Sequence, residues 1–437
     1  MVICSVIKGK RIKISAKNGI VHVWDLTKSI YIDFEPHYRK KLLETLRELS
    51  PNKSWYSIGK MLYPTINPKK AFNSIVPFVK RNRKASFKLV KKICEFLTSY
   101  GYEEFSLENM ERHINRIASD NPANEIVNPK LPFNFNSPNG SRFLSAIFHD
   151  GGITKKLNPF YVNFDSNMRR LIKNSAIKTF GDIEGRIEGK KQLTFPKIIG
   201  EILVYGLGLP SGRKIYFDPN IPEFITKADK KIRIAFIKQA FDDEGSIGKC
   251  HIRLQLAGIS EPSKLLKDNK KLIESLDIHT TKIIKTQEYF TKNNGRHECY
   301  AFFITGRLNL LKYHQIINFN IAQKSNKLKI LLDNYKQWQT GRNKALDYAL
   351  ENICKLELEG KIINSEELIK ATCRSKSSVL WYLKELTKLG SIKIIKDSCP
   401  KAIGKGPTFR EFKLTREGRK KLGLPIFPST DERTFCF

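Results

Sequence analysis

Three features are missing from this sequence, and each argues against a class of protein. The eight cysteines include no C-x-x-C pair, which excludes a zinc ribbon, argues against a disulfide scaffold and favours a reducing, intracellular compartment. No uninterrupted apolar run reaches the roughly 18 residues that a membrane span needs. The first fifteen residues become polar too soon for a secretory signal, so we expect no membrane partner.

Acidic residues are also scarce. The 437 residues include 43 Asp and Glu against 78 Lys and Arg, which gives a formal net charge of +35. A compact chain with this charge repels itself, and the obvious counter-charge is nucleic acid. Hydrophobic residues make up 41%, which is enough to build packed cores. The composition therefore predicts a folded nucleic-acid-binding protein, and the length predicts two to four domains.

The N-terminal third changes from strand-like to helix-like periodicity. Residues 1–36 alternate between apolar and polar, whereas residues 37–118 repeat with a helical period in short helices broken by prolines. The breaks fall at Pro51, Pro64, Pro68 and Pro77. This pattern predicts a module like a helix-turn-helix, with a small helical domain with a solvated basic face as the alternative. The Pro/Asn-rich segment 119–140 is typical of a linker.

Residues 341–425 have the element order of a winged helix, and residues 426–437 follow as a tail. Three helical patterns precede a strand at 391–395, a Lys/Gly-rich loop and a second strand at 409–415. The order resembles winged helix-turn-helix domains of prokaryotic regulators, whose third helix enters the major groove. Candidate DNA contacts on the third helix and the wing are Arg374, Ser375, Lys376, Ser378, Lys401, Lys405 and Arg410. A winged helix used for protein contacts is the alternative.

The centre of the chain contains two related segments. They read FLSAIFHDGGI (143–153) and IKQAFDDEGSI (237–247). Each is an apolar run of helical period that ends in an acid, Asp150 or Glu244, followed by glycine and then by an isoleucine that opens a strand. This repetition predicts two copies of one α/β unit, related by a pseudo-two-fold axis.

Together with their flanks, these segments resemble the LAGLIDADG family of homing endonucleases in its single-chain, two-repeat form. Matching flanks include FPKIIGEILVYGLGLPSGRK (195–214) and AQKSNKLKILL (322–332). The resemblance implies repeats at 141–230 and 231–337, with saddle-shaped antiparallel sheets that grip duplex DNA. It also implies lysines near the scissile phosphates and backbone carbonyls that join the acids at a metal. The lysines are Lys214 and Lys324, and the carbonyls belong to His149 and Asp243.

The chemistry of the two acids can be argued apart from the resemblance. Small residues such as Ser145 and Ala240 allow two helices to approach closely, which brings the acids at their ends together. Converging carboxylates repel each other unless a hard divalent cation neutralises them, and oxygen-only ligation is typical of Mg²⁺ or Mn²⁺. Either acid alone is explained by a structural turn. Lys238 and Gln239 stand where the family usually has small residues, so the resemblance implies a looser helix interface than usual.

The strand after the second motif supplies candidate DNA contacts. Alternation along residues 249–256 places hydrogen-bonding and mostly cationic side chains on one face and apolar side chains on the other. The polar set is Lys249, His251, Arg253 and Gln255. The counterparts in the first repeat are Lys155, Lys156, Tyr161 and Asn163, with Arg186, Lys190 and Lys191 on a later strand. Such residues suit contacts to base edges and phosphates.

These observations predict an α+β multidomain protein with an N-terminal β/helical module, a pair of α/β repeats and a C-terminal winged helix. The predicted function is Mg²⁺-dependent, site-specific cleavage of double-stranded DNA by a monomer in the cytoplasm, associated with the nucleoid. Asp150 and Glu244 are the predicted metal-binding acids. Two alternatives remain: a transcriptional regulator that has lost cleavage, and an RNA maturase that binds a structured intron RNA. An intein is excluded, because the expected terminal nucleophile and His-Asn pair are missing.

Overall fold

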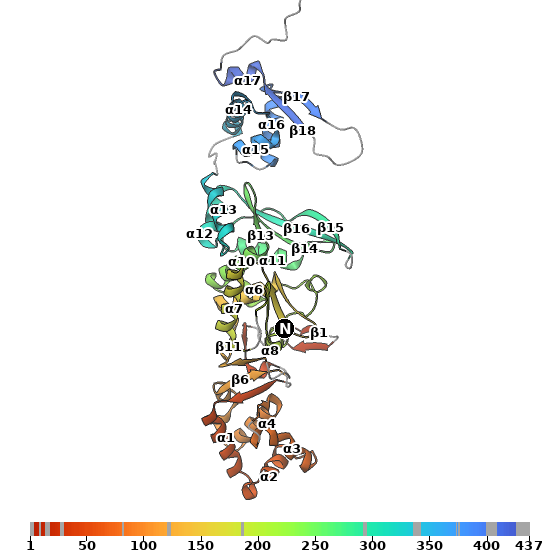
Figure 1. Cartoon of the computed structure of the whole chain (residues 1–437), viewed down its shortest axis with the longest axis vertical. Helices are drawn as coiled ribbons and strands as arrows, with labels where there is room; N and C mark the ends of the chain where they lie inside the picture. The colour runs from red at the N-terminus through yellow and green to blue at the C-terminus, as the bar shows by residue number, and fades with distance from the viewer. Residues whose placement is uncertain are drawn as a thin grey trace, which may run out of the picture. The chain divides into compact units, whose positions relative to one another are not determined.

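The computed structural model shows a mixed α+β protein with several antiparallel sheets (Figure 1). It describes residues 4–7, 10–13, 18–26, 30–80, 83–119, 124–184, 188–291, 295–334, 342–372, 374, 376–398 and 409–424. The chain divides into two compact units. The first comprises residues 1–246, 253–303 and 312–325, and the second comprises residues 247–252, 304–311 and 326–437. Among the helices described, none has the length and apolar character to cross a membrane.

A five-stranded antiparallel sheet organises the N-terminal part of the first unit. Its strand order is β11-β7-β6-β4-β5. The strands are β4 (Tyr31–Phe34), β5 (Ala85–Ser86), β6 (Ile114–Ala118), β7 (Glu125–Val127) and β11 (Asp182–Ile183). Shorter pairs are β1 (Cys4–Ile7) with β2 (Lys10–Lys13), and β3 (Ile20–Val21) with β8 (Phe133–Asn134). The segment 119–140, predicted as a linker, thus contributes two strands, because its apolar residues Ile126 and Phe133 are buried.

Helices α1 to α5 belong to the same part of the chain. They are α1 (Pro36–Glu48), α2 (Trp55–Leu62), α3 (Pro68–Val79), α4 (Phe87–Ser99) and α5 (Leu107–Glu111). Pro36 and Pro68 stand at the first position of a helix, where the missing N–H has no intrahelical partner to lose. Pro77 was expected to break a helix, but α3 continues to Val79. Pro77 lies in its last turn, where few downstream hydrogen bonds depend on it.

Two helix–strand–strand–helix repeats follow. The first contains α6 (Pro138–Phe148), β9 (Gly151–Ile153), β10 (Pro159–Val162), α7 (Ser166–Phe180), β12 (Gln192–Thr194) and α8 (Lys197–Glu201). The second contains α9 (Glu223–Thr226), α10 (Lys230–Glu244), β13 (Gly245–Ile247), β14 (His251–Gly258), α11 (Lys264–Glu274), β15 (Ile284–Thr291), β16 (Gly295–Thr305), α12 (Arg307–Ile316) and α13 (Ala322–Asp333). The sheet orders are β12-β10-β9 and β13-β14-β16-β15. The predicted repetition of elements is therefore present.

The elements of residues 342–421, all in the second unit, include an antiparallel hairpin (Figure 1). They are α14 (Arg342–Leu358), α15 (Ser365–Thr372), α16 (Lys376–Lys388), β17 (Ile392–Ser398) and β18 (Phe409–Leu414), followed by α17 (Arg416–Lys421). One apolar core joins them, because Ile353, Leu368, Leu383 and Phe412 from four different elements belong to a single buried cluster. These residues occupy the faces that the helical and strand periodicities predict.

Candidate active site

The site begins with the packing of α6 against α10, which lie side by side (Figure 1). The hydroxyl groups of Ser141 and Ser145 on α6 donate hydrogen bonds to the carbonyls of Ile232 and Phe236 on α10, at 2.9 and 2.7 Å. Both serines and Ala240 are fully buried. Direct side-chain-to-backbone bonds between two helices require close approach, which confirms the role predicted for the small residues.

The end of each helix holds one of the two acids. Asp150 lies two residues after α6, Glu244 is the last residue of α10, and a glycine follows each. A side chain at Gly151 would collide with the carbonyl oxygen of Ala146, and one at Gly245 would collide with that of Phe241. The glycine after each acid is therefore a steric requirement of a strand that turns back past the end of its own helix.

The two acids lie close enough to influence each other. Burial raises the pKa of Glu244 to about 7, and the charge of Asp150 adds to the increase. Burial likewise raises the pKa of Asp150 above its ordinary value. The charges of Lys214 and Lys324 oppose both increases, so the structure brings all four predicted catalytic residues into one electrostatic group.

The two lysines make equivalent contacts in the two repeats. The ammonium of Lys214 donates to the carbonyl of Phe148 at 2.8 Å and to that of His149, at the end of α6. The ammonium of Lys324, on α13, donates to the carbonyl of Phe241 at 3.2 Å and to the next carbonyl, at the end of α10. Carbonyls near the end of a helix carry partial negative charge, and that of Phe241 also accepts a hydrogen bond from the backbone amide of Gly245. Burial lowers the pKa of Lys214 to about 8, although Glu244 and Asp150 oppose the decrease.

Asp243 has a partner set that the sequence did not reveal. The hydroxyl of Tyr161 donates to its Oδ1 at 2.7 Å, and the amide of Gln239 donates to the same oxygen at 2.9 Å. Asn163 donates to the Tyr161 hydroxyl at 3.0 Å and to Oδ2 of Asp150 at 3.5 Å. Burial raises the pKa of Asp243 well above its ordinary range. The predicted backbone ligand Asp243 therefore also brings a third carboxylate to the acids.

Two sequence predictions need correction here. Tyr161 was predicted to contact DNA, but its side chain is fully buried and its hydroxyl is bound to Asp243, so that prediction is wrong. A looser helix interface was expected from Gln239. The structure instead buries Gln239 completely and bonds it to Asp243, while hydrogen bonds still join the two helices.

The contacts of Asp242, unlike those of Asp243, hold a neighbouring segment of the chain in place. Its carboxylate accepts hydrogen bonds from the backbone and side-chain amides of Asn320, at 2.8 and 2.7 Å, and from the backbone amide of Ile321 at 3.2 Å. This segment immediately precedes α13, which carries Lys324. Asp242 thereby fixes the lysine of the second repeat against the end of α10.

The chemistry of this cluster fits a divalent cation. Its donors are carboxylate oxygens, and Oδ2 of Asp243 is buried without a hydrogen-bond partner among the described residues. Burying several acids together is unfavourable unless positive charge neutralises them, as the raised pKa values of Asp150 and Glu244 indicate. An oxygen-only donor set is typical of Mg²⁺ or Mn²⁺. Asp150 and Glu244 would hold such an ion, with Asp243 beside them.

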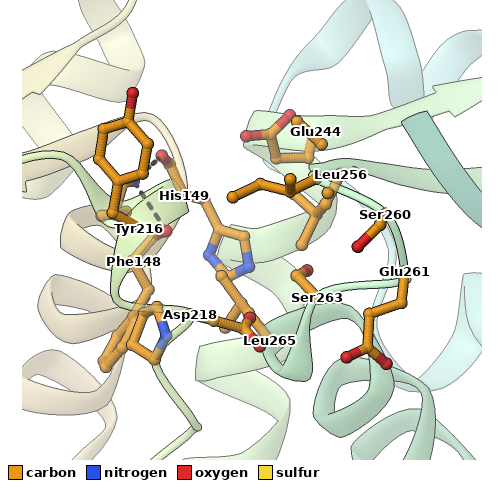
Figure 2. A pocket seen from close by; sticks show the side chains of 15 residues that line it. Phe148, His149, Tyr216, Asp218, Glu244, Leu256, Ser260, Glu261, Ser263 and Leu265 are labelled. Atoms are coloured by element: carbon orange, nitrogen blue, oxygen red, sulfur yellow. Dashed lines mark hydrogen bonds between the residues drawn. The ribbon is translucent and has the colours of Figure 1, made fainter. Parts of the chain in front are cut away.

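A cavity of about 470 Å³ opens beside the acids. It lies between the end of α6, the segment Lys214–Pro219 and the end of β14, and Figure 2 shows His149 and Glu244 among its lining residues. The Nδ1 atom of His149 contacts the Ser145 carbonyl at 2.7 Å, and its Nε2 faces the amide of Asn269 at 3.1 Å. Burial lowers the pKa of His149 to about 3. The imidazole of His149 is therefore uncharged at neutral pH and lines the cavity.

Strand β14 has the predicted alternation. Ile252, Leu254 and Leu256 are buried, whereas His251, Arg253 and Gln255 are half-buried on the opposite face. Lys249, just before the strand, is exposed. The half-buried face of the strand and the exposed Lys249 thus carry the four residues that the sequence predicts as DNA contacts.

The other predicted DNA contacts are placed as follows. Lys155 and Lys156 are exposed in the turn between β9 and β10, Lys190 is exposed before β12, and Asn163 is half-buried beside Asp150. In the second unit, Arg374 and Ser378 are half-buried and Lys376 and Arg410 are exposed, at the start of α16 and on β18. Arg186, Ser375, Lys401 and Lys405 lie outside the described residues.

Comparison with known proteins finds similarity only among solved structures. No family model matches the chain, and no curated protein matches it. A solved structure described as "Structures and dynamics of mesophilic variants from the homing endonuclease I-DmoI" is similar, with 18% identity and a TM-score of 0.29. The match covers 45% of this chain and 98% of that one.

Proposed function

We propose that the chain is a site-specific, double-stranded DNA endonuclease of the LAGLIDADG type that depends on a divalent cation. The observation that supports this most is the repeated arrangement at the ends of α6 and α10. A half-buried acid stands at or just after the end of each helix, and a lysine from the same repeat binds carbonyls near that end. A purely structural turn would not require two acids whose negative charges repel each other.

Asp150 and Glu244 would hold a Mg²⁺ or Mn²⁺ ion. Such an ion would supply Lewis-acid activation of the phosphodiester and of the attacking water. Lys214 and Lys324 place positive charge beside the acids, where it stabilises the negative charge that develops on the phosphate. The hydrogen bonds from Tyr161 and Gln239 keep Asp243 in a fixed position behind the reacting groups.

The net positive charge of the protein supports DNA as its substrate. The net charge of +35 supports binding to phosphate backbones, and the polar face of β14 supports base contacts in the major groove. In this account the two sheets of the repeats form the saddle that holds the duplex. The second repeat contacts the DNA through β14, and the first repeat contacts it through the β9–β10 turn. The duplex is then held by both of the repeats that carry the acids.

The flanking parts extend the recognised site in this account. Helices α14 to α16 and the β17–β18 hairpin act as a winged helix, with Lys376 at the start of α16 facing base edges and Arg410 meeting phosphate. Helices α2 and α3, which pack against each other, act as a second DNA-binding module. Linking such modules to the core raises their effective concentration on one DNA molecule.

The test is cleavage of the genomic region that flanks the gene, with the gene removed so that an uninterrupted target is restored. In Mg²⁺ we expect one discrete double-strand cut, and with EDTA we expect none. An Asp150→Asn/Glu244→Gln variant should bind the same fragment without cutting it. A Glu223→Gln variant, which changes an exposed acid, should cut like the parent protein.

A non-cleaving transcriptional regulator is the second candidate, and the element order of the second unit favours it. A regulator would bind the flanking DNA in a salt-sensitive way and leave it intact in Mg²⁺ and Mn²⁺. The same assay therefore separates the two functions. Selective binding of a folded intron RNA in place of duplex DNA would instead support the maturase.

A further inference from the structure

Three potential metal ligands meet at the N-terminal sheet, far from the acid cluster in sequence. They are Glu35, His37 and His113, and the ligand atoms they offer lie within 4.8 Å of one another. The donor set is two imidazole nitrogens and one carboxylate oxygen. It differs in kind from the oxygen donors of the acid cluster.

The backbone holds two of these residues opposite each other. Strands β4 and β6 pair antiparallel with Phe34 facing Ile114, which places Glu35 and His113 as the next pair along the two chains. The backbone amide of Glu35 donates to the carbonyl of His113 at 3.0 Å. Both ligands therefore extend from the edge of a hydrogen-bonded ladder, where their spacing is fixed.

The start of α1 supplies the third ligand and orients one of the others. Glu35 precedes the helix and His37 is its second residue, so a short stretch of chain carries two ligands. The ring of His113 stacks on Tyr38 with a centroid distance of 4.2 Å and an interplanar angle of 13°. This stacking limits the rotation of the His113 ring and keeps its Nδ1 atom turned toward Glu35.

The distances match those between ligands of a tetrahedral ion. One oxygen of Glu35, Oε2, lies 3.2 Å from Nδ1 of His113 and 3.6 Å from Nε2 of His37. Zinc bonds of about 2.0–2.1 Å at tetrahedral angles place ligand atoms roughly 3.3 Å apart. Two of the three ligand pairs thus already have the required spacing, and a small rotation of the exposed His37 side chain would adjust the third.

We propose that Glu35, His37 and His113 form a zinc site with its fourth position open to solvent. Imidazole nitrogens favour Zn²⁺ over Mg²⁺, so the site would not compete for the cation of the acid cluster. The His37 side chain is 73% exposed and that of Glu35 is 45% exposed, which gives an ion a direct path from solution. A bound ion joins the start of α1 to the end of β4 and the start of β6. It therefore stabilises the N-terminal part of the chain, independently of any nuclease activity.

The test is a zinc titration of the full chain after removal of metals by a chelator. Excess Mg²⁺ is present to saturate oxygen-only sites, and a chromophoric chelator competes for the added Zn²⁺. We expect one strong site per chain, and the His37→Ala variant should bind at least tenfold more weakly. His279→Ala is the matched control, because His279 is also exposed and lies 4.0 Å from a single carboxylate, that of Asp277. It should bind like the parent protein.

A second measurement guards against variants that misfold. Zinc should raise the melting temperature of the parent protein and of His279→Ala, and it should have no effect on His37→Ala or Glu35→Gln. The proposal is overturned if the parent protein has no strong site under these conditions. It is equally overturned if His37→Ala and Glu35→Gln keep the parent's zinc affinity, because the cluster would then be a hydrogen-bonded His–carboxylate group only.

Discussion

The hydroxyl of Tyr161 donates a 2.7 Å hydrogen bond to Asp243, and this bond joins the first repeat to the second. Tyr161 lies on β10 and Asp243 lies on α10, one residue before Glu244. The bond therefore connects the strand beside one acid to the helix that carries the other. It fixes the position of the first repeat relative to the second near the two acids.

Removal of this bond should destabilise the protein. Tyr161→Phe keeps the buried ring but leaves the Asp243 carboxylate with one donor fewer, at a cost of about 1–3 kcal/mol in the free energy of unfolding. Urea denaturation measures this change. Tyr216→Phe is the control, because the Tyr216 side chain is 58% exposed and its loss of a hydroxyl should have little effect. Equal stability of the two variants would contradict the account.

The pKa of Glu244 predicts a pH dependence of stability in the metal-free protein. Its ordinary value of 4.5 rises to about 7 in the folded chain. The folded state then binds more protons than the unfolded state between these values, so the free energy of unfolding falls as pH rises through this window. Glu244→Gln removes the effect and should be more stable than the parent protein at pH 8, by roughly 1–3 kcal/mol.

The comparison for this prediction is made at two pH values with EDTA present. Well below pH 4.5 Glu244 is protonated in both the folded and the unfolded state, so the advantage of the Glu244→Gln variant should shrink there. The exposed acid Glu223 supplies the control variant, Glu223→Gln, for which no such advantage at pH 8 is expected. A stability difference that stays constant with pH would show that Glu244 does not titrate as described.

The paired lysines should affect the rate of cleavage more than DNA binding. Lys214→Ala and Lys324→Ala each remove a positive charge from beside the acids, and we expect single-turnover rates to fall about 10²–10³-fold. DNA affinity should change much less, because in the proposed function many other basic residues share the contacts to the DNA backbone. Melting temperatures of both variants show whether the helix-end carbonyls tolerate the loss. Rates close to that of the parent protein would assign the lysines a structural role alone.

Substitution of exposed basic residues in the first repeat should change the affinity for DNA and leave the rate of cleavage nearly unchanged. Lys155→Ala should weaken binding similarly for all sequences and reduce the slope of log affinity against log salt concentration by about one. Lys271→Ala, on the exposed surface of α11, changes the same charge at a site outside the proposed saddle. Fluorescence anisotropy over a range of salt concentrations compares the two, and identical slopes would place Lys155 away from DNA.

The sequence was sufficient for the features that depend on local pattern. The acid–glycine ends of α6 and α10, the alternation of β14 and the three helices of the second unit all follow from periodicities of 3.6 and 2. The pairing of Asp150 with Glu244 also followed, because two copies of one motif imply one shared interface. Each helix or strand in this group is predicted from one short segment of sequence, and the acid pair from two such segments.

The features that the sequence did not reveal depend on contacts between distant segments. Nothing near Asp243 indicates that Tyr161, on another strand, would reach it, and the same strand pattern led to the wrong prediction of Tyr161 as a DNA contact. Register decides which face of β10 is buried, and one sequence leaves that register open. The meeting of Glu35 with His113 likewise depends on the pairing of β4 with β6.

The most direct test of the central claim is quantitative cleavage at the mapped site by the Asp150→Asn/Glu244→Gln variant. The account predicts that the rate in Mg²⁺ falls at least 10³-fold, while the affinity for the same DNA stays within about threefold of the parent value. Both quantities are measured on one labelled fragment, with Ca²⁺ in place of Mg²⁺ for the binding assay. Cleavage by the variant at a rate near that of the parent protein would contradict the account.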